Sequence, residues 1–127
     1  EILSDSGAEF AKVIHPRAII SESVTIGKGC VVLAGAIINA DTDIGDNVIV
    51  NTGSVIEHDN TIDAHAHVAP GAVLTGNCHL GKLSLFGAGA VSVPGKRIGS
   101  EVVVGAGSVV VGDIPDGKTA VGIPAKW

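Results

Sequence analysis

The amino-acid sequence predicts an all-β fold, a left-handed parallel β-helix of five to six coils. Three observations predict it. An apolar residue returns every six residues along most of the chain, and glycines return every eighteen residues in two series. The composition of the 127 residues agrees, because 18 glycines with only 2 phenylalanines and no tyrosine or methionine suit a narrow interior of small and β-branched side chains.

The six-residue repeat defines the inward side chains. From Ile14 to Val110 one position recurs in steps of six without an insertion, and only Ser92 in this series is not apolar. A second position, four residues further on in each hexad, holds mostly small residues between Cys30 and Ser108. Each hexad is therefore expected to send one large and one small side chain into the core, with a turn between them.

Two series of glycines set the size of one coil. They recur at spacings of eighteen, with Asp63 in place of one member: Gly27, Gly45, Gly81 and Gly99 in the first series, and Gly35, Gly53, Gly71, Gly89 and Gly107 in the second. Three hexads therefore make one coil of a triangular prism with parallel strands on each face. A doubly wound α/β fold is disfavoured, because no segment shows the 3.6-residue periodicity of crossover helices.

The register also divides the chain and places its cysteines. It predicts a lead-in over residues 1–13, the β-helix over residues 14–112 and a C-terminal extension over residues 113–127. Cys30 and Cys78 both fall on the small inward position. Their separation of 48 residues is not a multiple of 18, so we expect two buried thiols on different faces that do not pair.

Charge and hydropathy disfavour two classes of partner. A net charge of −5 argues against a nucleic acid, whose binding needs clustered lysine and arginine. The sequence contains no run of about 18 apolar residues and no signal peptide, so a membrane span is not expected. The cysteine usage favours a reducing cytoplasm, and without an initiator methionine we expect a piece of a longer chain.

Histidine is the side chain best suited to proton transfer near neutral pH, and the sequence has five. None falls on an inward position of the repeat. We expect two in turns and three pointing outward from strands: His58 and His65, then His15, His67 and His79.

His58 is the strongest candidate for chemistry. Asp59 follows it, and a carboxylate beside an imidazole can hold its orientation and support its protonated form. The residues that stack on His58 at spacings of 18 leave open space beside it: Ala40, Gly76 and Pro94. His67 lies half a coil away, so a site that uses both histidines must lie between two subunits. Asn51 and His15 share another outward column, two coils apart.

Several segments together resemble a known family. They are Ile14–Ala18 (IHPRA), Asn51–Asp59 (NTGSVIEHD), His67–Ala72 (HVAPGA), Asp113–Asp116 (DIPD) and Val121–Lys126 (VGIPAK). They resemble the hexapeptide-repeat sugar acetyltransferases, in the branch of the sialic acid O-acetyltransferases and the N-acetyltransferases of UDP-4-amino sugars. The hexad alone is weakly specific, whereas the two histidine segments together are much more specific.

The resemblance implies a cytoplasmic homotrimer that binds acetyl-CoA between neighbouring subunits and acetylates an amine or hydroxyl of a sugar or nucleotide sugar. It implies His58 as general base with Asp59 supporting it, and no metal. Asn51, His67 and His15 would line the acceptor site. Backbone N–H groups around Gly76 would stabilise the oxyanion. The remaining acetyl-CoA contacts would come from Gly87, Ala88, Gly105, Ala106 and Lys126, with Lys118 as a further candidate.

Two departures from the family pattern carry expectations of their own. Family members place a nucleotide-sugar-binding domain before the helix, so residues 1–13 are expected to be a remnant of that domain. Lys96 falls on an inward position where a charge is costly, so we expect a bulge at Pro94–Gly95 that turns Lys96 and Arg97 toward solvent or coenzyme A.

Two other functions stay open at this point. One is a trimeric β-helix without an acceptor domain, which binds acetyl-CoA or serves as a scaffold but transfers nothing to a sugar. The other is a zinc enzyme like the gamma-class carbonic anhydrases, which hold the metal with three histidines between subunits. The spacings of 7, 9 and 21 residues from His58 to the later histidines do not fit that ligand pattern, so metal is disfavoured.

Overall fold

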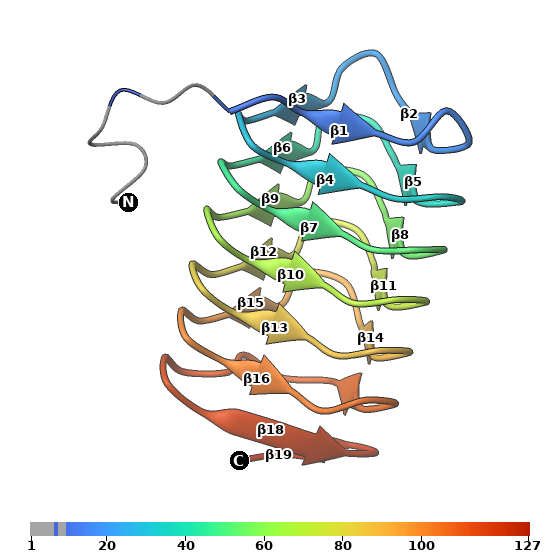
Figure 1. The fold of residues 1–127 in the computed structure, drawn as a ribbon. Coiled ribbons are helices and arrows are strands. Elements are labelled where there is room, and N and C mark those ends of the chain that lie inside the picture. The colour runs from blue at the N-terminus through green and yellow to red at the C-terminus, as the bar shows by residue number, and fades with distance from the viewer. Residues whose placement is uncertain (1–6, 8–9) are drawn as a thin grey trace.

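A computed structural model describes residue 7 and residues 10–127, so the predicted lead-in over residues 1–13 lies partly outside the described residues. The described residues form short strands joined by turns and contain no helix, which confirms the all-β prediction. About six coils stack into one column, with the described end of the N-terminal segment and the C-terminus at opposite ends (Figure 1). Within these residues no helix is present that could cross a membrane.

The strands form three sheets, here named face A, face B and face C. Face A contains β1 (Val13–Ile14), β4 (Val31–Val32), β7 (Ile49–Val50), β10 (His67–Val68), β13 (Leu85–Phe86), β16 (Val103–Val104), β18 (Thr119–Gly122) and β19 (Ala125–Lys126). Face B contains β2 (Ile19–Ile20), β5 (Ile37–Ile38), β8 (Val55–Ile56), β11 (Val73–Leu74), β14 (Val91–Ser92) and β17 (Val109–Val110). Face C contains β3 (Thr25–Ile26), β6 (Asp43–Ile44), β9 (Thr61–Ile62), β12 (His79–Leu80) and β15 (Arg97–Ile98).

The predicted eighteen-residue register is confirmed. Neighbouring strands pair in parallel, as when Val31 on β4 lies opposite Ile49 on β7. In the strands from β2 to β18 the second residue points inward, so stacks of aliphatic side chains such as Val32, Val50 and Val68 have no exposed surface. Burying a side chain of this size contributes about 1.5–3 kcal/mol, and the repeat multiplies that gain coil by coil.

Turns at the three corners bring the chain from one face to the next. We name the corners AB, BC and CA after the faces they join. From the residue-29 turn of corner CA onward, each regular corner turn has one residue with a positive φ, in the left-handed region, whereas the first turns of corners AB and BC have none. In corner AB this residue is a glycine in all five coils that have one, whereas corners BC and CA use several residues with side chains: Asp41, Asp59 and Asn77 in BC, and Asn47, His65, Leu83 and Glu101 in CA.

The cysteines behave as predicted, since Cys30 and Cys78 are both buried and free. Cys30 precedes face A and Cys78 precedes face C, so they belong to different corners. Burial raises the pKa of the Cys30 thiol, which keeps it protonated and unreactive at neutral pH.

The predicted bulge at Pro94–Gly95 is wrong. β15 keeps the regular register, with Arg97 opposite His79, and the Gly95 N–H donates to the Gly76 carbonyl at 3.0 Å as in other coils. Lys96 keeps its inward register position and is half-buried. A lysine is tolerated at such a position because its aliphatic stem can cover apolar surface while the ammonium reaches water.

The parallel ladder continues past residue 112, the predicted end of the β-helix. Ile114 pairs with Ile98, and Ala120 on β18 lies opposite Val104 on β16. Both pairs are 16 residues apart, so the last coil is two residues shorter than the others. β19 then turns back antiparallel to β18 and ends the sheet.

The outward side chains differ among the faces. Face C carries polar outward residues at every described rung: Thr25, Asp43, Thr61, His79 and Arg97. Faces A and B carry mostly aliphatic ones. On face A these are Val13, Val31, Ile49, Leu85 and Val103, with His67 among them, and on face B they are Ile19, Ile37, Val55, Val73, Val91 and Val109. Two of the three sides of the prism therefore present apolar stripes.

Candidate functional site

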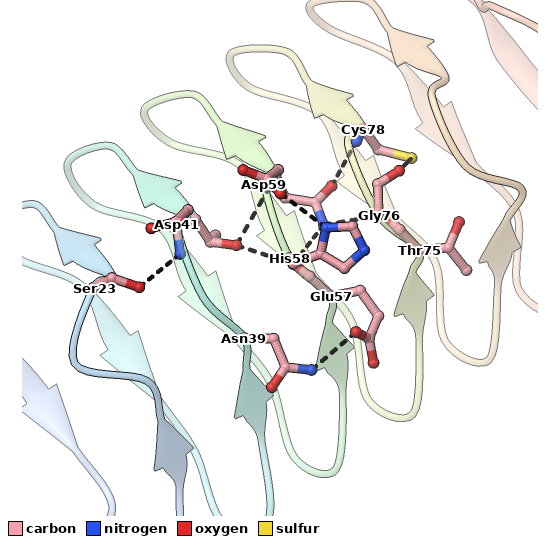
Figure 2. Close-up of polar contacts among 11 residues, drawn as sticks. Ser23, Asn39, Asp41, Glu57, His58, Asp59, Thr75, Gly76 and Cys78 are labelled. Atoms are coloured by element: carbon pink, nitrogen blue, oxygen red, sulfur yellow. Dashed lines mark hydrogen bonds and ion pairs between the residues drawn. The ribbon is translucent and has the colours of Figure 1, made fainter.

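His58 and Asp59 lie in the turn of corner BC between β8 and β9 (Figure 2). Nδ1 of the imidazole is 2.9 Å from Oδ2 of Asp59. Because an ionised carboxylate can only accept a hydrogen bond, Nδ1 carries a proton, and in the neutral ring Nε2 then keeps a free lone pair. The side chains are 61% and 56% exposed, so Nε2 is accessible to a substrate from solvent. This arrangement can accept a proton.

Gly76 lies directly against the His58 ring in the next coil. A Cβ at position 76 would lie 2.7 Å from both Cε1 and Nε2 of His58, closer than real Cβ atoms approach. The predicted stacking of these two residues along one edge is therefore confirmed, and only a glycine permits it. Gly76 sets the place of the imidazole by leaving room for it.

Backbone hydrogen bonds tie this turn to the coils on both sides. The Asp59 N–H donates to the carbonyl of Ala40 at 2.9 Å, and the Asn77 N–H donates to the carbonyl of His58 at 3.0 Å. Asp59 has φ 58°, in the left-handed region, which aspartate tolerates better than most residues with a side chain. The turn that presents the imidazole is therefore held on both sides.

Glu57 is a neighbour of the imidazole that sequence reasoning gave no role. Its Oε2 accepts a hydrogen bond from Nδ2 of Asn39 at 3.0 Å, one coil away. Both residues are half-buried and face outward beside corner BC. The spacing of 18 residues between an amide and a carboxylate is the signal that could have found the pair.

Asn51 and His67 form the second polar group of the predicted site. Nδ2 of Asn51 lies 3.0 Å from Nε2 of His67, and Oδ1 of Asn51 accepts the Thr52 N–H at 2.8 Å. That second bond fixes the amide, so its nitrogen faces the ring and donates to Nε2. His67 then carries its proton on Nδ1 and can donate it to a ligand.

His15 joins neither group. It directly follows β1, which lies two strands away from β7 on face A, and its Nδ1 accepts the Arg17 N–H at 3.0 Å. The column shared with Asn51 is confirmed, but the two side chains do not meet within the subunit.

The glycine-rich steps predicted to bind acetyl-CoA lie in corner AB. A Cβ at Gly87 would collide with the carbonyl oxygen of Val104, and one at Gly105 would lie 2.6 Å from Cγ1 of Val121. These glycines thus permit close packing of one coil on the next. Ala88 and Ala106 are exposed beside them. Lys126 is also exposed, on β19 next to a shallow depression lined by Ala125 and Trp127.

The His58–Asp59 pair and the Asn51–His67 pair therefore lie on opposite sides of the prism. His58, Asp59 and Gly76 occupy corner BC, whereas the Asn51–His67 pair belongs to face A, which lies opposite that corner. The half-coil separation inferred from the sequence is confirmed. The two groups do not meet within one chain.

The other histidines have different environments. Nε2 of His79 lies 2.7 Å from Oδ2 of Asp63, and Nδ1 lies 2.7 Å from Nη1 of Arg97, so both ring nitrogens are engaged. His65 sits in a turn of corner CA, where its backbone N–H donates to Asp46. Among the described residues, no group of three or more His, Cys, Asp or Glu side chains is arranged to hold a metal ion.

Two family profiles match the chain. "Bacterial transferase hexapeptide (six repeats)" matches residues 23–58, and "Hexapeptide repeat of succinyl-transferase" matches residues 76–111. The chain belongs to the hexapeptide-repeat transferase family. A search of curated protein sequences finds no significant match.

Solved structures of sugar acetyltransferases are similar over almost the whole chain. The acetyltransferase domain of PglB from Neisseria gonorrhoeae FA1090, solved also in complex with acetyl coenzyme A, shares 46% identity over 97% of this chain and 60% of its own, with a TM-score of 0.95. PerB from Caulobacter crescentus, in complex with CoA and GDP-perosamine, shares 46% identity over 97% and 59%, with a TM-score of 0.95.

WeeI from Acinetobacter baumannii AYE is more distant, with 31% identity over 98% of this chain and 61% of its own, and a TM-score of 0.94. The predicted resemblance to sugar acetyltransferases is thus confirmed. This hexapeptide-repeat chain spans about 60% of the length of these relatives.

Proposed function

We propose that this chain is the β-helix domain of an acetyl-CoA-dependent acetyltransferase that acts on an amine or hydroxyl of a nucleotide-linked sugar. One observation carries the proposal. In a chain 46% identical to the acetyltransferase domain of PglB, His58 presents an accessible Nε2 lone pair while Asp59 holds Nδ1 at 2.9 Å. The names of the relatives favour an amine acceptor, since PerB is described as a perosamine N-acetyltransferase.

His58 acts as the general base in this proposal. Its Nε2 takes the proton from the acceptor amine or hydroxyl as that group attacks the thioester carbonyl of acetyl-CoA. Asp59 keeps the proton of the neutral ring on Nδ1 and stabilises the imidazolium that forms. The backbone N–H of Gly76, beside the ring, is our candidate donor to the oxyanion. Acetyl transfer leaves the thiol of coenzyme A as the second product.

A homotrimer of left-handed β-helices completes the proposed site. The path from β1 through β2 and β3 to β4 in Figure 1 supports left-handed winding. If corner AB of each subunit points toward a three-fold axis, face A of one subunit faces face B of the next across a groove, so both apolar stripes turn toward the neighbouring subunits and the polar face C stays in water. This arrangement brings the Asn51–His67 pair of one subunit beside corner BC, and hence His58, of its neighbour.

The donor and acceptor then occupy the groove between subunits. We assign Ala88, Ala106 and Lys126 as contacts of acetyl-CoA, with Gly87 and Gly105 allowing the coils to pack closely beneath it. The Nδ1–H of His67 would donate to the acceptor, and Asn51 fixes that tautomer. His15 lies two coils away from Asn51, so it would contact a part of the acceptor that is distant from the Asn51–His67 pair. Because acetyl-CoA and nucleotide sugars are made in the bacterial cytoplasm, we place the enzyme there.

Calorimetric titration with acetyl-CoA, together with sedimentation analysis of the protein, tests this proposal. We expect saturable binding near one site per chain to a trimer, and then acetylation of GDP-perosamine or a UDP-4-amino sugar. Binding without transfer to either sugar would favour the scaffold hypothesis. If the protein does not bind acetyl-CoA, the proposed enzymatic function is refuted.

A further inference from the structure

The small inward residues that stack behind one corner are called here its inner column. The inner column of corner BC is the most polar column in the core. From the N-terminal end it contains Val24, Thr42, Asn60, Cys78 and Lys96. The inner columns of the other two corners hold alanine, serine, valine and cysteine. Asn60 is only 1% exposed and lies immediately after the His58–Asp59 turn.

The buried amide of Asn60 is fully engaged with two coils. Its Nδ2 donates to the carbonyl of Glu57 at 2.8 Å and to the carbonyl of Thr75 at 3.0 Å. Its Oδ1 accepts the N–H of Cys78 at 3.0 Å. Thr42, in the preceding coil, also donates its hydroxyl to the Glu57 carbonyl, at 2.9 Å.

The two carbonyls that Nδ2 bridges have a particular place in the chain. The Glu57 carbonyl belongs to the peptide group that leads into His58, and the Thr75 carbonyl belongs to the one that leads into Gly76. A single side chain thus links the backbone that carries the imidazole to the backbone on which the imidazole rests. The distance between these two turns decides where His58 Nε2 lies, because the ring already touches Gly76.

We propose that Asn60 is a positioning residue that fixes the His58 turn against the Gly76 turn and so holds Nε2 in the place where it accepts the proton. This proposal rests on the function proposed above. Serine or threonine cannot replace the asparagine in this role, because a hydroxyl has one hydrogen and can donate to only one of the two carbonyls.

Ser84 in corner CA provides a matched control. Its hydroxyl donates to the carbonyl of Gly99 at 2.7 Å and accepts the N–H of Val102 at 2.9 Å, which are the same two links between coils that Asn60 makes to Thr75 and Cys78. Ser84 is equally buried but is not next to the His58 turn. A general need for links between coils would affect both positions alike, whereas a positioning role affects only Asn60.

The test compares Asn60→Ser and Asn60→Thr with Ser84→Ala in the full trimeric protein. Thr42 shows that this column accommodates threonine, so the second variant retains a folded chain if the first does not. We expect kcat for acetyl transfer to fall about tenfold to a hundredfold in both Asn60 variants, because small displacements of a catalytic group are costly. KM for acetyl-CoA should stay within twofold, and Ser84→Ala should keep its kcat while losing stability to urea.

A nuclear Overhauser effect gives a readout that does not depend on activity. The ring proton on His58 Cε1 should show a contact with the Gly76 α-hydrogen that a Cβ would replace, and this contact should weaken in Asn60→Ser. An unchanged contact and unchanged kcat would overturn the proposal, and so would an equal loss of kcat in Ser84→Ala. If the unsubstituted protein transfers no acetyl group but the contact weakens in Asn60→Ser, the enzymatic function fails while the positioning role stands.

Discussion

Corners AB and BC follow the same backbone plan but use different residues. From the second coil onward, each regular turn places one residue in the left-handed region. Corner AB fills that position with glycine in five successive coils, whereas corner BC uses Asp41, Asp59 and Asn77 before its glycine. The inner columns differ in the same sense, with alanine and serine behind corner AB and Thr42 and Asn60 behind corner BC.

The difference shows where the molecule departs from its most stable sequence. A left-handed conformation costs a residue with a Cβ roughly 1–2 kcal/mol, with aspartate and asparagine among the residues that tolerate it best. Corner AB avoids this cost. Corner BC accepts it, and in the coil of His58 the result is a carboxylate 2.9 Å from the imidazole. Corner CA accepts the same cost at several positions, so a left-handed residue does not by itself mark the site; in corner BC it coincides with a reactive side chain.

Removal of the imidazole in corner BC should cause the largest loss of acetyl-transfer activity. We expect His58→Ala to lower the rate of acetyl transfer by ~10²–10⁴, because a general base contributes that much. The proposed trimer and its proposed affinity for acetyl-CoA should be retained, since the side chain is largely exposed. His79→Ala is the control, because His79 also pairs with a carboxylate but lies on face C. Near-full activity of His58→Ala in a steady-state assay would remove His58 from the mechanism.

A methyl group at Gly76 should have the next largest effect. Gly76→Ala places a Cβ 2.7 Å from Nε2 of His58, so the ring must swing away from its position. We expect kcat to fall about tenfold to a hundredfold with little change in stability, because an exposed ring can move. Gly112 lies in the same column and would bring its Cβ within 3.8 Å of Trp127 only, so Gly112→Ala should keep full activity. Equal effects of the two variants on kcat would contradict this account.

Asp59→Asn should reduce activity less than either change. Asn77 occupies the equivalent position one coil on with φ 59°, so asparagine suits this backbone and the urea midpoint should not move. The amide oxygen can still accept from Nδ1, but the charge that stabilises the imidazolium is lost, so we expect a loss of about tenfold in kcat. Loss of activity together with lower stability would point to a structural role for Asp59.

Most of the fold was predictable because one structural rule governs almost every residue. The six-residue spacing assigns an inward or outward direction to each side chain, and the buried stacks follow it from β4 to β17. The rule failed where a side chain can be accommodated in two different conformations. Lys96 could be placed by a bulge or by a half-buried stem, and the structure takes the second. The last coil is shortened by two residues, which a fixed period cannot anticipate.

The candidate site was predictable where its members are adjacent in sequence or in one column. His58 meets Asp59 in its own turn and Gly76 at a spacing of eighteen. The contact between Asn51 and His67 spans 16 residues and depends on side-chain direction, which the repeat does not specify. Asn60 was placed in the small inward series, but its hydrogen bonds depend on which carbonyls point into the core.

The smallest expected effect tests the energetic side of the comparison. Gly35 has φ 72° in corner AB, and a Cβ there would meet only the Gly53 backbone at 3.8 Å, so the cost of Gly35→Ala lies in the backbone alone. We expect its free energy of unfolding in urea to fall by roughly 1–2 kcal/mol. Gly35→Asn should lose less, because Asn77 adopts the same conformation in corner BC. Acetyl transfer should be unchanged in both, since Gly35 lies several coils away from the coenzyme contacts proposed at Ala88 and Ala106 and on another corner than His58. If Gly35→Asn lost as much free energy of unfolding as Gly35→Ala, tolerance of the left-handed conformation would not explain why corner BC uses aspartate and asparagine.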